Sequence, residues 1–300
     1  MMVIKFIFFI FIKNIINQVE RFLDRIKFLE NKAIQIRKEL LQMIYNSKTG
    51  HTGGSLSSVD ILVTLYYEIM KVDPKKPKWD LRDRFVLSKG HSVEGYYNIL
   101  ADLGFFPRDE LKNFCKFNSR LIGHPSVKIP GIEMNTGALG HGLSIAVGMA
   151  LAGKMDDKNY KVYVLMGDGE LAEGSIWEGA MAAGHYKLGN LIGIIDRNHL
   201  QISGNTENVM SLENLREKWT AFGWHTLVVD GHDIKELVKK FKELPKEEDK
   251  PHLIIANTIK GKGVPFIEND AKWHHKVPDE EQLKEALAIF NSQLNTNERS

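Results

Sequence analysis

The stretch from residue 162 to residue 200 reads as a strand, a helix and a second strand, and it constrains the fold of this 300-residue chain more than any other segment. One apolar run ends at the tripeptide Gly-Asp-Gly at 167–169, and a second, at 191–195, ends at Asp-Arg-Asn. Between them, apolar side chains recur at helical spacing. The crossover of such a unit is almost always right-handed, and both strands end at the sheet edge where open α/β sheets bind ligands. We therefore expect Asp168 and Asn198 to lie close together.

Asp168 and Asn198 offer the oxygen ligands that a hard cation takes. One carboxylate, one amide oxygen and a nearby backbone carbonyl make half of an octahedral shell, and Mg²⁺ usually takes the rest from phosphate and water. Gly167 and Gly169 allow a sharp turn and leave room for a phosphate beside the amides of the following helix. Because Gly-Asp-Gly alone can be a simple strand-ending turn, the metal-site interpretation depends on Asn198 at the end of the next strand.

Strands and helices alternate along the rest of the chain. Further strands are expected at 84–87, 225–229 and 253–258, and helices at 19–45, 58–70, 109–114, 143–152, 212–222 and 234–244. Three glycines between the first two helices predict a tight loop at 50–57. This order predicts one α/β domain with a doubly wound parallel sheet and helices on both faces.

The domain is expected to cover residues 19–285, between an apolar leader at 1–18 and a C-terminal tail at 286–300. The first 12 residues of the leader are almost entirely apolar but far too few to span a bilayer, and no small-residue cleavage site follows them. A wrongly assigned start codon, a loosely packed arm and a weak membrane anchor all fit this pattern. An arm exposed to solvent would be an aggregation hazard, so we expect a partner to cover it.

Composition excludes several classes of function. The 40 basic and 38 acidic residues give a net charge of +2, which argues against a nucleic-acid surface. The single cysteine excludes an internal disulfide framework and a thiolate-rich zinc site, and it favours a reducing, cytoplasmic setting.

Six of the eleven histidines directly follow a glycine. No two of the eleven are four residues apart, the one-turn helical spacing that is typical of zinc ligands. Imidazoles in glycine, proline or polar loops suit a polyhydroxylated, phosphorylated substrate, because they donate, accept and shuttle protons near neutral pH. The loop histidines are His51, His91, His124 and His274. By contrast, His232 belongs to a helix-capping turn, and we expect it to be structural.

Eight motifs occur in one order along the chain. They are G-H-T-G-G-S-L-S (50–57), D-R-F-V-L-S-K-G-H (83–91), I-G-H-P (122–125), T-G-A-L-G-H-G-L-S-I-A-V-G-M-A (136–150), G-D-G-E-L-A-E-G (167–174), N-L-I-G-I-I-D-R-N-H-L-Q-I-S-G (190–204), D-G-H-D (230–233) and T-I-K-G-K-G (258–263). With this set, residues 34–277 resemble the N-terminal half of a transketolase, a thiamine-diphosphate enzyme.

The resemblance implies roles by motif position. Asp168, Asn198 and the Leu200 carbonyl would bind Mg²⁺ or another divalent cation such as Ca²⁺ or Mn²⁺. The implied contacts of thiamine diphosphate are His91, Gly137, Leu139, Asp168, Gly169, Glu173, Asn198, Lys260 and His274. The implied catalytic residues are His51, His91, His124, Glu173 and His274, of which Glu173 matches a buried acid that links paired active sites at the dimer interface.

The chain also departs from the family pattern. His141 stands where glutamine is usual, and His275 stands where glycine is common. Nothing after Val277 could supply the pyrimidine-binding and third domains of a full transketolase.

The resemblance therefore implies the N-terminal subunit of a split transketolase, which transfers a two-carbon ketol unit from a ketose phosphate to an aldose phosphate. Its expected partner is a separate C-terminal subunit with the pyrimidine-binding domain, in a heterotetramer of two chains of each kind. Two alternatives stay open. One is a half-chain of another thiamine-dependent carboligase, related to deoxyxylulose-phosphate synthase, and the other is a non-catalytic scaffolding subunit with the same fold.

Overall fold

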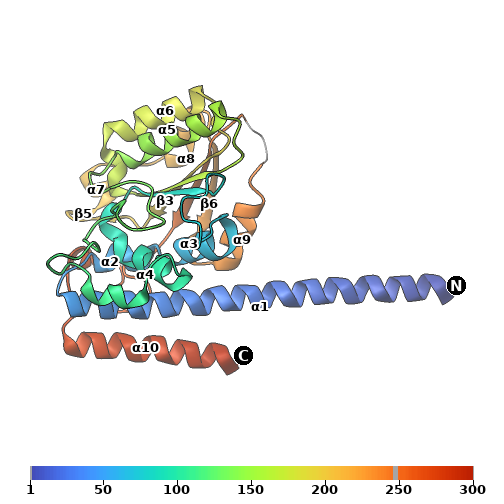
Figure 1. Cartoon of the computed structure of the whole chain (residues 1–300), viewed down its shortest axis with the longest axis horizontal. Coiled ribbons are helices and arrows are strands. Elements are labelled where there is room, and N and C mark those ends of the chain that lie inside the picture. Colours follow the sequence, from blue (N-terminus) through green and yellow to red (C-terminus); the bar gives the residue numbers. More distant parts are fainter. Residues whose placement is uncertain (1, 246–248, 300) are drawn as a thin grey trace.

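The computed structural model describes residues 2–245 and 249–299. A five-stranded parallel sheet forms its centre (Figure 1). In spatial order the strands are β1 (Arg84–Leu87), β2 (Val162–Gly167), β3 (Leu191–Arg197), β7 (His252–Asn257) and β6 (His225–Asp230). A short antiparallel pair, β4 (Leu200–Gln201) and β5 (Gly204–Asn205), follows β3. The predicted α/β fold with a parallel sheet is confirmed.

Helices cover both faces of this sheet (Figure 1). One face carries α5 (Gly142–Met155), α6 (Gly174–His185) and α8 (Leu215–Ala221), and the other carries α3 (Val59–Thr64), α4 (Val93–Leu103) and α9 (Ile234–Lys242). Alternation along a strand explains the two cores, since Val164 packs with the first group of helices and its neighbour Leu165 with the second. A strand that is buried on both faces has a continuous apolar sequence.

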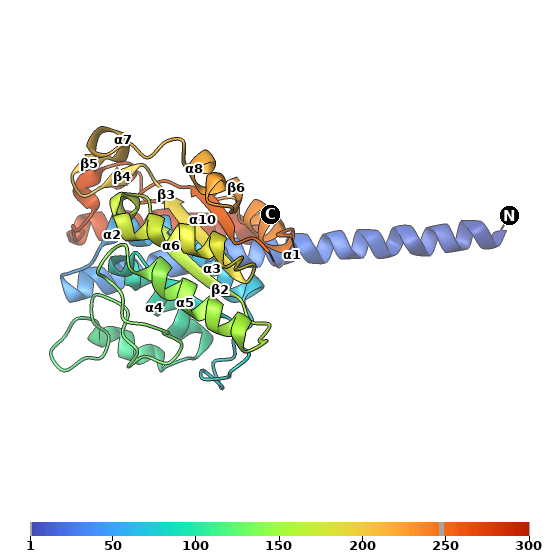
Figure 2. The same cartoon turned by 90° about the horizontal axis from the view of Figure 1, so that it is seen from above.

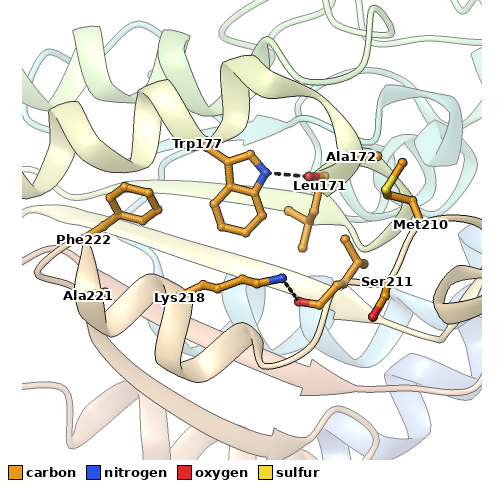
Figure 3. Close-up of a pocket in the computed structure, with 9 residues that line it drawn as sticks. Leu171, Ala172, Trp177, Met210, Ser211, Lys218, Ala221 and Phe222 are labelled. Atoms are coloured by element: carbon orange, nitrogen blue, oxygen red, sulfur yellow. Dashed lines mark hydrogen bonds between the residues drawn. The ribbon is translucent and has the colours of Figure 1, made fainter.

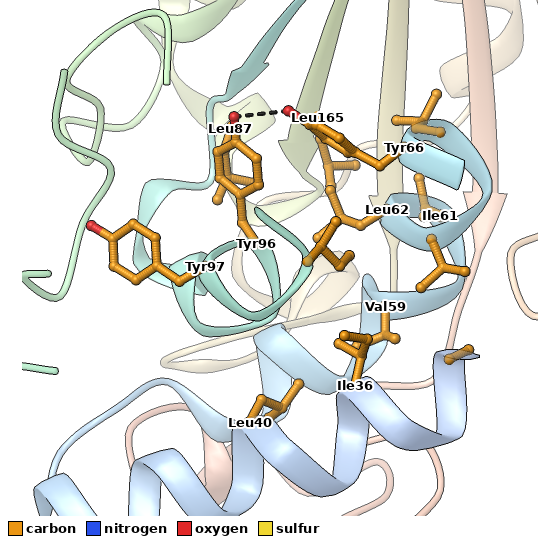
Figure 4. Packing of buried hydrophobic residues seen from close by; sticks show 14 of the residues in the cluster. Ile36, Leu40, Val59, Ile61, Leu62, Tyr66, Leu87, Tyr96, Tyr97 and Leu165 are labelled. Atoms are coloured by element: carbon orange, nitrogen blue, oxygen red, sulfur yellow. Dashed lines mark hydrogen bonds between the residues drawn. The ribbon is translucent and has the colours of Figure 1, made fainter. Parts of the chain in front are cut away.

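Two further helices, α1 (Met2–Ser47) and α10 (Glu280–Arg299), form an outer layer beside α3 and α4. Figure 4 shows Ile36 of α1 meeting Val59 of α3 in the buried core. Figures 1 and 2 show that the N-terminal half of α1 extends beyond the body of the domain. The expected leader at 1–18 enters this helix, although the side chains of 1–15 lie outside the described part.

The boundary expected between residues 285 and 286 falls inside α10. Ala286 and Phe290 are buried in the same core as the inner face of α1. Residues 286–299 thus continue the outer helical layer. Among the described residues, no helix combines the length and the apolar character needed to cross a bilayer.

Three local predictions need correction. The expected loop at 50–57 contains a buried helix, α2 (Thr52–Ser57), because its glycines allow close packing: a Cβ at Gly53 would lie 2.9 Å from the Trp273 carbonyl oxygen. The helix expected at 58–70 changes after α3 into a π-helical turn, η1 (Leu65–Ile69). Strand β3 continues through Arg197, two residues beyond the expected end.

Several short helical elements connect the larger ones. They are η2 (Gly90–Ser92), η3 (Arg108–Asn113), η4 (Gly169–Ala172), α7 (Thr206–Val209) and η5 (Ala271–Trp273).

Candidate active site at the carboxyl edge of the sheet

The strand register brings the residues that follow each strand to one edge of the sheet. Gly167 of β2 pairs with Asp196 of β3, and Arg197 of β3 pairs with Asn257 of β7. Asp168, Asn198 and the loop after residue 257 therefore start side by side, as expected for parallel strands.

Asp168 is the acid that joins two of these strand ends. Its side chain is 2% exposed, and its Oδ1 accepts a hydrogen bond of 2.8 Å from the Gly169 amide. Its Oδ2 accepts one of 2.6 Å from the amide of His199, the residue that follows Asn198. Asn198 is also buried, and its Oδ1 accepts from the Leu200 amide at 3.1 Å. Asp168 and Asn198 therefore lie in the turns that follow two adjacent strands, at the same edge of the sheet.

The charge of Asp168 is incompletely compensated. Arg197 lies 3.3 Å from Asp168 Oδ2, but the same guanidinium also bonds Glu207 at 2.7 Å and Glu213 at 2.9 Å. Burial, together with the nearby Asp196, raises the pKa of Asp168 to about 6. A bound cation would favour the ionised form of such a carboxylate. Sequence reasoning did not identify Arg197, which has the same strand-end signal as Asn198.

Lys260 connects the loop after β7 to this edge. Its Nζ lies 3.2 Å from the Leu200 carbonyl oxygen and 3.0 Å from Nδ1 of His274. Burial, with Lys89 nearby, lowers the pKa of Lys260 to about 8. Burial also lowers the pKa of His274 to about 3, with Lys260 contributing. His274 is therefore neutral at pH 7, and its Nδ1 accepts from the Lys260 ammonium.

The loop histidines converge on His51. The ring centroid of His51 lies 5.1 Å from that of His91, 6.3 Å from that of His124 and 5.6 Å from that of His274. The rings of His91 and His274 stack at 5.2 Å. His275 is the nearest ring to His51 of these four, at 4.5 Å. The sequence marked His275 only as a departure from a pattern, and the structure makes it a fifth member of the cluster.

Burial favours the neutral form of the four predicted loop histidines in this cluster. It lowers the pKa of His51 to about 4, with His275 and His124 contributing. Burial also lowers the pKa of His124, and it brings that of His91 well below the ordinary value. Each neutral imidazole offers one donor and one acceptor, a combination that matches sugar hydroxyls and carbonyls.

Gly137 and His124 show why a glycine loop adjoins the cluster. Gly137 has a φ of +134°, and a Cβ at this position would lie 2.4 Å from Cδ2 of His124. Only glycine fits both the backbone and the contact. Leu139, two residues on, is half-buried, and its carbonyl oxygen lies 3.1 Å from Nδ1 of the exposed His141. Gly169 is comparably confined, since its Cβ would lie 2.8 Å from that of Gln201.

Two acids in the G-D-G-E-L-A-E-G motif differ in their surroundings. Glu173 is the N-cap residue of α6, but its side chain makes no capping hydrogen bond and is exposed. Glu170 is buried and accepts from the Gly140 amide at 2.9 Å, the Gly167 amide at 3.1 Å and the Ser88 hydroxyl. Glu170 thus ties the ends of β1 and β2 to the loop before α5, a role that sequence reasoning missed.

Across 2–245 and 249–299, no three His, Cys, Asp or Glu side chains converge so as to hold a metal. The expected set differs from such a cluster, since it consists of one carboxylate, one amide oxygen and one backbone carbonyl. Oxygen ligands of this kind, completed by phosphate and water, suit Mg²⁺.

A separate hollow of about 540 Å³ lies between α6 and α8 (Figure 3). Its lining is mainly apolar, with Trp177, Phe222 and Met210 facing it, and none of the expected site residues takes part. The histidine cluster and the Asp168 edge are therefore the candidate active site.

Comparison with known proteins gives one consistent result. Residues 29–294 match the family model for the thiamine diphosphate binding domain of transketolase. The chain is 52% identical over 270 residues to one subunit of the apulose-4-phosphate transketolase of Phocaeicola vulgatus, covering 90% of this chain and 96% of that one. It is 44% identical over 261 residues to a 6-deoxy-6-sulfo-D-fructose transketolase subunit of Clostridium sp. strain MSTE9, covering 87% and 95% respectively.

A solved transketolase from Campylobacter jejuni has a TM-score of 0.81 and 34% identity to this chain. The match covers 88% of this chain and 43% of the solved one. The chain thus spans nearly the whole of two subunit relatives and less than half of the solved protein.

Proposed function

The chain belongs to the transketolase family, whose thiamine-diphosphate-binding domain it matches over most of its length, and from this membership we propose that it is the N-terminal subunit of a split transketolase. The observation that carries the proposal is the fraction of each relative's length that this chain matches. Two relatives named as transketolase subunits are matched over 96% and 95% of their lengths, whereas a solved transketolase is matched over 43%. The relatives favour this function over a different carboligase or a scaffold.

We infer a partner that carries the pyrimidine-binding domain, in a cytoplasmic heterotetramer of two chains of each kind. Glu173 supports an interface with another chain at the start of α6, because this acid is exposed on the single chain. Gly148 of α5 and Gly174 of α6 support it as well, since a Cβ at either position would meet open space. A surface with such small side chains lets another chain approach closely.

Thiamine diphosphate and Mg²⁺ fit the residues at the sheet edge. Asp168, Asn198 and the Leu200 carbonyl would hold Mg²⁺, with Ca²⁺ or Mn²⁺ as substitutes. The fit rests on the buried Asp168 carboxylate, whose neighbouring cation, Arg197, is shared with Glu207 and Glu213. When bound, thiamine diphosphate supplies the carbon nucleophile and the electron sink for breaking and forming the carbon–carbon bond.

The chain's own residues bind and orient the cofactor. Lys260 would place its ammonium against the diphosphate, and Gly169 would let the phosphate approach the amides of the following turn. The remaining contacts that we propose are His91, Gly137, Leu139, Glu173 and His274.

Neutral histidines would handle the sugars. His51, His124 and His274 can each hold a hydroxyl while they give or take a proton, since their lowered pKa values keep them neutral at pH 7. His91 stacks on His274 and would fix that ring beside the cofactor. The reaction that we propose is transfer of a two-carbon ketol unit from a ketose phosphate to an aldose phosphate.

Reconstitution tests the proposal. The chain is mixed with the candidate pyrimidine-domain chain from the same genome, and ketol transfer is measured with thiamine diphosphate and Mg²⁺. We expect activity from the pair and none from either chain alone. Pyruvate decarboxylation without ketol transfer would instead identify a carboligase related to deoxyxylulose-phosphate synthase, and cofactor binding without any turnover would identify a scaffold.

A further inference from the structure

His232 bonds two parts of the chain that are far apart in sequence. Its Nδ1 lies 2.7 Å from Oδ2 of Asp60, and its Nε2 lies 2.8 Å from the amide nitrogen of Ile259. A backbone N–H can only donate, so Nε2 is the acceptor, and the ring proton is on Nδ1, from which it is donated to Asp60. The orientation and the tautomer of His232 are thereby fixed from both sides.

The Asp60 side of this contact is anchored in the core. Asp60 lies on α3, and its carboxylate receives two hydrogen bonds from the guanidinium of Arg37 on α1, one of them 2.9 Å long to Oδ1. Burial raises the pKa of Asp60, but Arg37 and His232 outweigh this effect and hold it at about 2. Asp60 is therefore ionised at neutral pH, and two packed helices fix its position.

The Ile259 side leads directly to the candidate active site. Ile259 immediately precedes Lys260, whose Nζ lies 3.2 Å from the Leu200 carbonyl oxygen. On the other side of Lys260, the Gly261 amide donates to the Gly53 carbonyl at 2.9 Å. The short segment that carries Lys260 is thus held by hydrogen bonds on both sides of this residue, and the Lys260 carbonyl itself accepts from the Asn269 amide at 2.9 Å. Of these contacts, only that of the Ile259 amide is made by a side chain outside the loop.

We infer that His232 is a positioning residue for Lys260: the series Arg37–Asp60–His232 holds the Ile259 amide and thereby sets where the Lys260 ammonium lies. Without an acceptor, the partly buried Ile259 amide would shift toward water, because an unsatisfied buried donor is costly. A shift of this segment would move Nζ away from Leu200. The consequence for the cofactor rests on the proposed function, whereas the consequence for the segment itself does not.

Two substitutions separate the two hydrogen bonds of His232. In His232→Gln, the side-chain carbonyl reaches the place of Nε2 and can accept from Ile259, but the bond to Asp60 is lost. In His232→Asn, the amide group reaches the place of Nδ1 and can donate to Asp60, but Ile259 is left without an acceptor. Both variants are neutral and lose one hydrogen bond each, so we expect similar melting temperatures.

Two measurements then compare these variants. Hydrogen exchange at amides 259–261 is followed in the full chain, and the Kd for thiamine diphosphate with Mg²⁺ is measured in the reconstituted pair. We expect about tenfold faster exchange and about tenfold weaker binding in His232→Asn than in His232→Gln, the size of one hydrogen bond. His185→Asn, at the exposed end of α6, is the control and should match the unsubstituted chain.

Equal exchange and equal Kd in the Gln and Asn variants would overturn the inference and leave His232 a purely structural residue. Faster exchange with an unchanged Kd would overturn its link to Lys260. If the unsubstituted pair binds no thiamine diphosphate, the proposed function fails, but the exchange comparison still decides whether His232 positions the segment.

Discussion

The backbone amide of His199 donates a 2.6 Å hydrogen bond to Oδ2 of Asp168, so the turn after β3 and the acid after β2 form one unit. An amide offers this carboxylate only the partial charge of a dipole, and the nearest cation, Arg197, is shared with two glutamates. Burial and the nearby Asp196 raise the pKa of Asp168 to about 6, and Arg197 offsets this rise only in part. A buried carboxylate with so little compensating charge supports the cation site that we propose at this edge.

Asp168→Asn should weaken cofactor binding strongly without unfolding the chain. The amide cannot neutralise a divalent cation, so we expect the Kd for thiamine diphosphate with Mg²⁺ to rise by about two orders of magnitude or more. A carboxyl pKa raised in the folded state means that ionised Asp168 destabilises the fold above pH 6. The cofactor-free variant should therefore be at least as stable as the original, as measured by urea unfolding at pH 7.5.

Asp196→Asn is the matched control at the same edge. Asp196 forms a fully buried ion pair with Lys89, which lowers its pKa despite burial. Removing one charge of such a pair leaves the other buried without a partner, so we expect the free energy of unfolding of Asp196→Asn to fall by about 3–5 kcal/mol. Tight cofactor binding by Asp168→Asn in calorimetry would refute the metal-site assignment.

The histidine cluster should make the fold sensitive to acid. Because the pKa of His51 is about 4 and that of His274 about 3, the unfolded chain takes up protons as pH falls below about 6.5, and the folded chain does not. Stability should therefore be full above pH 6.5 and fall as pH drops toward 4. Asp168 acts in the opposite direction between pH 6 and 4, and so do Glu94, Glu133 and Glu170, whose pKa values burial also raises. His252, whose pKa burial lowers to about 4, adds to the effect of the cluster.

We expect a loss of about 2 kcal/mol between pH 7.5 and pH 5, discounted for the partial exposure of the rings. Urea unfolding at the two pH values measures it. His51→Gln should reduce the pH dependence, because one of the titrating groups is gone. A free energy of unfolding that stays constant or rises on acidification would contradict the neutral cluster.

Those parts of the site that have a local sequence signal could be predicted. The strand–helix–strand pattern before Asn198 indicated the shared edge, and glycine before His51 and His91 indicated loops that approach a ligand. Contacts between distant segments, such as that of Asp60 with His232, have no period or motif to reveal them. The helical spacing of Leu283, Ala286 and Phe290 was a readable signal, but it was assigned partly to a tail.

Gly137→Ala should damage the site through His124. The new methyl group would lie 2.4 Å from Cδ2 of His124, at a φ of +134° that alanine rarely adopts. We expect a loss of about 2 kcal/mol in stability or more, together with weaker cofactor binding, measured by urea unfolding and calorimetry. Gly148→Ala on α5 is the control for the urea unfolding of the chain alone, because no atom of the chain lies within 4 Å of its Cβ position. Equal free energies of unfolding for the two variants would show that the loop accommodates the new methyl group without loss of stability.

His275→Gly should change substrate affinity more than turnover. The ring of His275 is exposed and lies 4.5 Å from that of His51, so it can contact a sugar at the rim of the cluster. A contact that is equally strong in the bound substrate and in the transition state affects KM and leaves kcat unchanged. Loss of one hydrogen bond of this kind should raise KM about tenfold. Melting temperature should not change. A fall in kcat at constant KM would instead give His275 a part in the chemical step.

Phe290→Ala tests whether residues 286–299 belong to the folded domain. Phe290 is 0% exposed on α10 and packs in the core that α1 shares. Truncating a buried phenylalanine usually costs about 3–5 kcal/mol, so urea unfolding should show a loss of that order. Asn295→Ala, exposed on the same helix, should leave stability within about 0.5 kcal/mol. Cofactor affinity is the second readout, and we expect it to fall modestly where the variant is folded, because the Phe290 ring packs on Gly263 in the loop that carries Lys260: a Cβ on Gly263 would lie 2.8 Å from Cε1 of Phe290. Figure 1 shows α10 alongside α1. A loss below about 1 kcal/mol would mean that the helix docks too weakly to count as part of the domain.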